Sequence, residues 1–97
     1  MTQPETRTPT EVDHDVRKSV LPPWAVILHN DDFNTMSYVV TCLVNTIPGM
    51  SPDRANEIML EAHNHGRAHV TTCPLELAEL YRDRLEALVL TATIERA

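Results

Sequence analysis

The sequence contains few of the residues on which nucleotide-binding and nucleic-acid-binding sites depend. Its only glycines are Gly49 and Gly66, which are too few and too far apart to form a phosphate-binding loop. Aromatic residues make up 4% of the chain, so we expect no platform on which unpaired bases could stack. The net charge of −6 would repel a phosphate backbone. We therefore expect no nucleic-acid partner and no nucleotide cofactor.

Long apolar runs and cysteine clusters are also missing. No stretch approaches the roughly 20 apolar residues that cross a bilayer, and Glu5, Arg7 and Glu11 interrupt the region where a signal peptide would be apolar. Cys42 and Cys73 form no C-x-x-C pair, so we expect two free thiols in a reducing compartment. These features predict a cytoplasmic protein without a membrane partner.

The length of 97 residues allows one small domain. Residues 1–23 hold four of the seven prolines and almost no large apolar side chain before Val20, so they cannot bury enough surface to offset the entropy of ordering them. We predict a flexible N-terminal extension over residues 1–23 and a folded core over residues 24–97. The extension is either a passive solubilising tail or a segment that another protein binds.

Hydrophobic periodicity and turn residues predict the order β-α-α-β-α-β in the core. We therefore expect an α+β fold in which a three-stranded antiparallel sheet packs against three helices. The predicted elements are a strand at 24–29, a helix at 36–46, a helix from Pro52 that stops at Gly66, a strand at 68–72, a helix that begins at Pro74 and a strand at about 89–95.

Spacing in the last third of the chain predicts which side chains face the core. Apolar residues at i, i+4, i+8 and i+11 mark one stripe of the third helix, and alternation marks one face of the last strand. The helix stripe is Leu77, Tyr81, Leu85 and Leu88, and the strand face is Leu90, Ala92 and Ile94.

The densest polar cluster, Asn30-Asp31-Asp32, lies between the first strand and the first helix. Acidic residues at the start of a helix stabilise it by about 0.3–1 kcal/mol each, which would account for them without a ligand. Their oxygens would also suit a metal ion or an ammonium group. His63 lies at the edge of the apolar stripe of the second helix, where it either complements the negative end of the helix dipole or faces a ligand.

Metal and enzyme sites have less support. His65 and His69 lie on either side of Gly66 and share no continuous helix face, and neither cysteine has zinc-finger spacing. Cys73 precedes a helix, which could lower the pKa of its thiol, and His69 could come near it, but nothing supplies an oxyanion hole. We expect no metal, no cofactor and no enzymatic activity.

Two segments resemble the signature motifs of the ClpS family, adaptors of the bacterial Clp ATP-dependent protease. The first is residues 26–36 (VILHNDDFNTM), and the second is residues 59–63 (MLEAH) followed by 66–68 (GRA). The resemblance extends from Trp24 to Ala97. It implies the fold expected above, which is also that of the C-terminal domain of a ribosomal stalk protein.

The resemblance implies an adaptor that binds proteins with an N-terminal Leu, Phe, Tyr or Trp. It would deliver them to the N-terminal domain of an AAA+ unfoldase, ClpA or ClpC, for degradation by ClpP. The residues that would hold the α-amino group are Asn30, Asp31, Asp32 and His63. Those that would line the pocket for the first side chain are Leu28, Asn34, Met36, Val39, Met59, Ala62 and Leu90. Glu76 and Tyr81 match positions that the family uses against the unfoldase.

The chain departs from the family pattern at several of these positions. Asn34-Thr35 stands where the family often has Thr-Pro, and Ala62 replaces a usual Val, so we expect a more polar and larger pocket. Tyr81 stands where a Lys is usual. The alternative is a structural interaction domain of the ribosomal-stalk type without an amine pocket, which would have no need of Asn30, Asp32 and His63 together.

Overall fold

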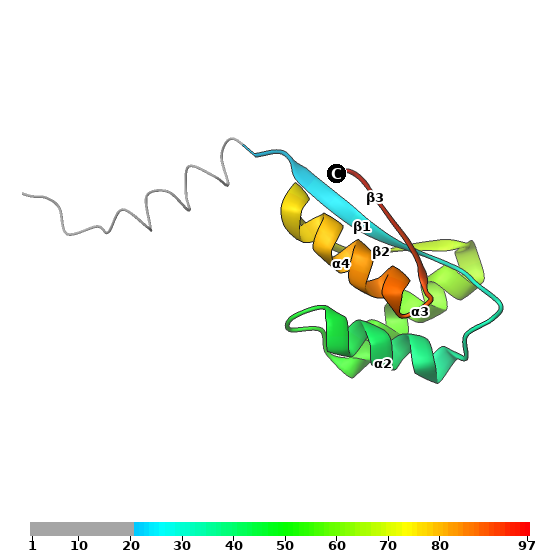
Figure 1. The fold of residues 1–97 in the computed structure, drawn as a ribbon. Coiled ribbons are helices and arrows are strands. Elements are labelled where there is room, and N and C mark those ends of the chain that lie inside the picture. The colour runs from blue at the N-terminus through cyan, green and yellow to red at the C-terminus, as the bar shows by residue number, and fades with distance from the viewer. Residues whose placement is uncertain (1–20) are drawn as a thin grey trace, which may run out of the picture.

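The computed structural model describes residues 21–97, so the predicted extension lies outside the described residues except for its last three. The elements are β1 (Pro23–His29), α2 (Met36–Thr46), α3 (Pro52–His65), β2 (Arg67–Pro74), α4 (Leu75–Ala87) and β3 (Thr91–Arg96) (Figure 1). Both β2 and β3 pair antiparallel with β1, in the order β2-β1-β3. The predicted element order and the α+β fold with an antiparallel sheet are confirmed. None of the described helices is long and apolar enough to cross a membrane.

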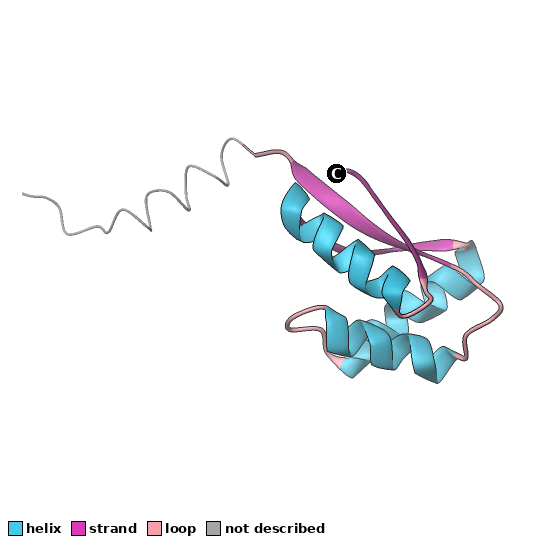
Figure 2. Ribbon diagram, in the orientation of Figure 1, coloured by secondary structure: helices cyan, strands magenta, loops and turns pink. Residues whose placement is uncertain are grey.

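The central position of β1 explains its continuous apolar sequence. Val26 and Leu28 point into the core beneath the helices, which gather on one side of the sheet (Figure 2). Ala25 and Ile27 alternate with them and lie under the opposite face, where they are buried as well. Across that face Arg67 on β2 forms a 2.7 Å ion pair with Glu95 on β3. A strand that is buried on both faces must be apolar at successive positions.

Local capping signals fix the bounds of α2 and α3. The side-chain oxygen of Thr35 accepts a hydrogen bond from the backbone N–H of Tyr38 at 3.2 Å, and that of Ser51 accepts one from Arg54 at 3.1 Å. Gly66 ends α3 with a left-handed φ of 92°. Both helices therefore begin and end where the sequence predicts.

The core lies between the sheet and the helices. Its largest fully buried side chains come from β1 and from all three helices: Val26, Leu43, Ile58 and Leu85. Leu90, Ala92 and Ile94 pack into the same core, as predicted for one face of the last strand.

Two details of the α4–β3 region differ from the prediction. Leu77 is 41% exposed, whereas Ala78 is completely buried, so the predicted apolar stripe of α4 is wrong at its first member. β3 begins at Thr91 rather than at about residue 89, because Leu88 caps α4 and Val89 takes a left-handed φ of 70°. A left-handed residue breaks the extended conformation that a strand requires.

Candidate functional site

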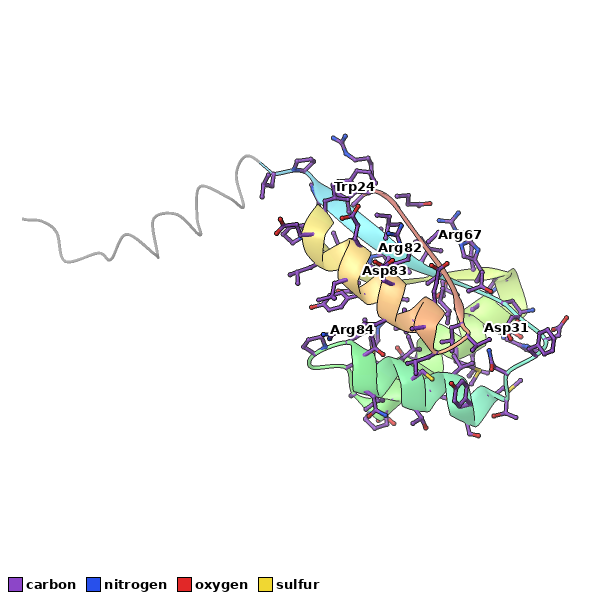
Figure 3. All side chains as sticks on the ribbon, viewed as in Figure 1. Trp24, Asp31, Arg67, Arg82, Asp83 and Arg84 are labelled. Atoms are coloured by element: carbon purple, nitrogen blue, oxygen red, sulfur yellow. The ribbon has the colours of Figure 1, made fainter. Side chains whose placement is uncertain are left out.

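A cavity of about 170 Å³ opens between the end of β1, the turn that precedes α2, and α3. The label of Asp31 in Figure 3 marks this turn, at the opposite end of β1 from Trp24. The cavity brings together all the predicted amine-binding residues and all the predicted pocket residues except Leu90. Its lining residues are Leu28, His29, Asn30, Asp31, Asp32, Asn34, Met36, Val39, Met59, Ala62 and His63.

The pairing of β1 with β2 brings the two halves of the cavity together. His29, the last residue of β1, lies opposite Arg67, the first residue of β2. Because α3 runs directly into β2, its last turn, with His63, lies beside the polar turn that begins at Asn30. Residues more than thirty positions apart in the sequence thus form one site.

Asp31 holds the polar turn in shape. Its Oδ1 atom accepts hydrogen bonds from the backbone N–H groups of Phe33, at 3.0 Å, and of Asn34, at 2.9 Å. These bonds occupy one oxygen of the half-buried carboxylate. Asp32 is exposed, and among residues 21–97 no group donates a hydrogen bond to its carboxylate. The other Asp31 oxygen accepts from the side chain of Asn34 at 3.1 Å, so Asp32 is the free carboxylate of the turn.

The rest of the cavity wall is largely apolar. Leu28, Met59 and Ala62 are buried, and Met36 is 46% exposed, so Met36 lies at the rim between the cavity and the surface. An apolar protein cavity of about 150 Å³ accommodates a benzene ring. The volume of this cavity therefore suits a side chain the size of Leu or Phe.

The arrangement suits binding better than catalysis. Within residues 21–97 there is no group of three His, Cys, Asp or Glu side chains that could hold a metal ion. Cys73 is a free thiol outside the cavity, and burial raises its pKa, so the predicted lowering by the helix N-terminus is wrong. His69 does not activate it: its Nε2 atom lies 2.6 Å from the hydroxyl oxygen of Thr72.

Leu90 lies elsewhere than predicted, and one lining residue was missed. Leu90 is in the core, 3% exposed, and does not line the cavity. Glu76 is exposed and Tyr81 packs partly against the core, both on α4, which contributes no lining residue. His29 lines the cavity although the sequence did not single it out, and its Nε2 atom lies 2.7 Å from the hydroxyl oxygen of Thr93. Its position directly before the polar cluster was the available signal.

Comparisons with a family model and with individual proteins match this chain to the same family. The family model of the ATP-dependent Clp protease adaptor protein ClpS matches residues 20–93. The ClpS protein of Gloeobacter violaceus is 49% identical over 80 residues, which cover 82% of this chain and 86% of that protein. The chloroplastic CLPS1 of Arabidopsis thaliana is 45% identical over 87 residues, covering 88% of this chain and 55% of that protein.

A solved structure has a similar fold. It is that of Agrobacterium tumefaciens ClpS2 bound to L-phenylalaninamide, which matches with a TM-score of 0.71 and 27% identity. The match covers 78% of this chain and 98% of the other. With the family model matching most of the chain and the fold shared, the chain belongs to the ClpS family, whose members are adaptors of the ATP-dependent Clp protease and not enzymes.

Proposed function

We propose that this chain binds proteins that begin with a bulky hydrophobic residue (Leu, Phe, Tyr or Trp) and delivers them to a Clp AAA+ unfoldase for degradation by ClpP. The observation that carries this proposal is the cavity, in which apolar walls lie beside Asn30, Asp32 and His63. An interaction domain of the ribosomal-stalk type would have no use for such a cavity.

The polar end of the cavity suits a free α-amino group. An ammonium group carries a positive charge and three N–H donors. The Asp32 carboxylate, the Asn30 amide oxygen and a neutral His63 imidazole nitrogen supply three acceptors, and Asp31 adds negative charge while it holds the turn. Each hydrogen bond to a charged group contributes about 1.5–3 kcal/mol. We assign these residues to the N-terminal amine of the substrate.

The apolar end suits the first side chain of the substrate. Burial of a Leu or Phe side chain contributes about 1.5–3 kcal/mol. Together with the amine contacts, and after the entropic cost of association, this supports a dissociation constant on the order of 1 µM. The solved relative, ClpS2 of Agrobacterium tumefaciens, binds phenylalaninamide, a molecule with a free amine and a phenyl ring. That ligand supports the same division of the cavity here.

We also propose that the N-terminal domain of the unfoldase, ClpA or ClpC, binds a surface on α4 around Glu76 and Tyr81. The α4 helix lies outside the cavity, so a substrate and the unfoldase can be bound at the same time. Glu76→Arg should weaken binding of the unfoldase N-terminal domain about tenfold, the loss of one charged contact. Glu86→Arg makes the same charge change elsewhere on α4 and is the control.

We propose the cytoplasm as the site of action, because two free cysteines agree with a reducing compartment.

The test of substrate recognition compares two peptides that begin with Phe and differ only in acetylation of the α-amine. The free peptide should bind with micromolar affinity in a fluorescence or calorimetric titration. Acetylation removes the charge and leaves buried acceptors unpaired, so the affinity should fall about 100-fold or more. Equal affinities would refute recognition of the amine and would favour the interaction-domain alternative.

A further inference from the structure

Two acceptors hold the side-chain amide of Asn34 in one orientation. Its Nδ2 atom donates to the Asp31 carboxylate, at 3.1 Å from Oδ2 and 3.3 Å from Oδ1. The same nitrogen donates to the backbone carbonyl oxygen of Val89 at 2.9 Å. A carboxylate and a carbonyl oxygen accept hydrogen bonds but cannot donate them, so the amide nitrogen must face both. A flipped amide would place its oxygen against two other oxygens.

This orientation leaves one hydrogen-bonding atom of Asn34 free. Both N–H groups of the amide are committed, whereas the amide oxygen receives no hydrogen bond from any other residue within 21–97. The residue is half-buried and lines the cavity. An unpaired acceptor in a partly buried wall raises the free energy of the complex whenever an apolar ligand group displaces its water.

The other lining side chains on this wall offer no comparable acceptor. Leu28, Met36, Val39 and Met59 present only hydrocarbon and thioether groups. The remaining polar lining residues are those that the proposed function assigns to the amine, together with His29, whose Nε2 atom is already in contact with Thr93. A donor on the first side chain of a substrate would therefore find its partner in Asn34.

Building on the proposed function, we infer that Asn34 is a specificity-determining residue whose amide oxygen selects an N-terminal residue with a hydrogen-bond donor, Tyr above all, over Phe and Leu. The Tyr hydroxyl donates to the amide oxygen, whereas the Phe ring leaves that oxygen without water and without a partner. One neutral hydrogen bond that forms in place of an unpaired buried acceptor corresponds to about a tenfold difference in affinity.

The experiment titrates three peptides that are identical except at the first residue, which is Tyr, Phe or 4-fluorophenylalanine. The fluoro analogue fills nearly the same volume as Tyr but has no donor. The unsubstituted protein should bind the Tyr peptide about tenfold more tightly than both others. This comparison needs no variant, so it holds even if a substitution at position 34 prevents folding.

Two variants, Asn34→Ala and Tyr38→Phe, then test whether Asn34 causes the preference for the Tyr peptide. In Asn34→Ala the ratio of Tyr to Phe affinity should fall to about one, even if the looser turn weakens all three peptides. Tyr38→Phe is the matched control, because its hydroxyl donates to the backbone carbonyl oxygen of Leu88 at 2.8 Å, next to Val89, but the residue does not line the cavity. It should keep the preference for Tyr.

The outcomes separate this inference from the proposed function. Equal affinity for Tyr and Phe peptides in the unsubstituted protein would overturn the role of Asn34, and so would a preference that survives Asn34→Ala. If none of the free peptides binds, the proposed function itself fails. Binding of Phe and Tyr peptides with equal strength would leave the proposed function intact and refute only the inference about Asn34.

Discussion

The backbone N–H of Asn30 donates a 3.0 Å hydrogen bond to the carbonyl oxygen of Gly66. This bond joins the first residue after β1 to the residue that ends α3. It extends the β1–β2 pairing by one step and sets the polar turn of the cavity beside the helix that carries His63. The geometry of the site therefore depends on the conformation of Gly66 as well as on the residues that line the cavity.

Substitution of Gly66 should damage both stability and the site. Gly66 has a φ of 92°, and Gly49, in the loop between α2 and α3, has a φ of 77°. A Cβ atom at either position would meet no atom within 4 Å, so the cost of alanine is backbone strain, about 1–2 kcal/mol. Gly66→Ala and Gly49→Ala should lower the free energy of unfolding by similar amounts in urea titrations.

Only Gly66→Ala should also weaken binding of a Phe peptide, by about tenfold, because the Gly66 carbonyl oxygen moves away from Asn30. Gly49→Ala should bind that peptide as the unsubstituted protein does. If both variants bound it equally well, the Asn30–Gly66 bond would have no part in shaping the site.

The sequence predicted most of the fold because its signals are local. Thr35 and Ser51 cap their helices, and Gly66 ends α3 at the predicted residue. The polar cluster and His63 were also identified from the sequence, because the two motifs are compact. These features depend on neighbours within a few positions, which a single sequence displays directly.

The missed features depend on contacts between distant parts of the chain. A β-branched residue such as Val89 disfavours a positive φ, so its local sequence does not predict the turn between α4 and β3. Contacts with distant residues hold Val89 in that conformation. Asn34 donates to Val89 across 55 positions in the sequence. Leu77 is exposed because α4 turns Ala78 into the core, and periodicity alone cannot distinguish these neighbouring faces. Leu90 was expected both in the core and in the pocket, and the structure places it only in the core.

Met36 should restrict the shape of the first substrate side chain. Met36 lines the cavity and is partly exposed, so at the rim it would contact a side chain that branches at Cβ. Met36→Ala should bind peptides that begin with Ile or Val about tenfold more tightly than the unsubstituted protein does. Met50→Ala removes a thioether that packs against the core outside the cavity and should leave this selectivity unchanged. If Met36→Ala also left it unchanged, Met36 would be a packing residue only.

The turn after α4 stores strain that glycine should relieve. Val89 is 70% exposed and has a φ of 70°, so glycine would lose little packing there. Because the relief of strain exceeds the added entropy of the unfolded chain, Val89→Gly should raise the free energy of unfolding by about 0.5–1 kcal/mol. Ala87→Gly, at the exposed last residue of α4, has no such strain to relieve and should lower it by up to about 1 kcal/mol. A Val89→Gly variant that is less stable than the unsubstituted protein would show that Val89 is not strained.

Cys73 should resist alkylation when the protein is folded. Burial raises the pKa of its thiol, so at a given pH the folded chain holds less of the reactive thiolate than the unfolded chain does. The pH dependence of iodoacetamide labelling at Cys73, followed by peptide mapping, should have a higher midpoint in the native protein than in urea. By linkage, the neutral thiol favours the folded state below the ordinary thiol pKa of about 8.5, and this contribution disappears as the pH rises through the higher native value. Asn56→Cys in a Cys73→Ser background places a thiol at an exposed position on α3. The labelling midpoint of this exposed thiol in the native protein should match its midpoint in urea. If the native and urea midpoints of Cys73 also matched, burial would not control the reactivity of Cys73.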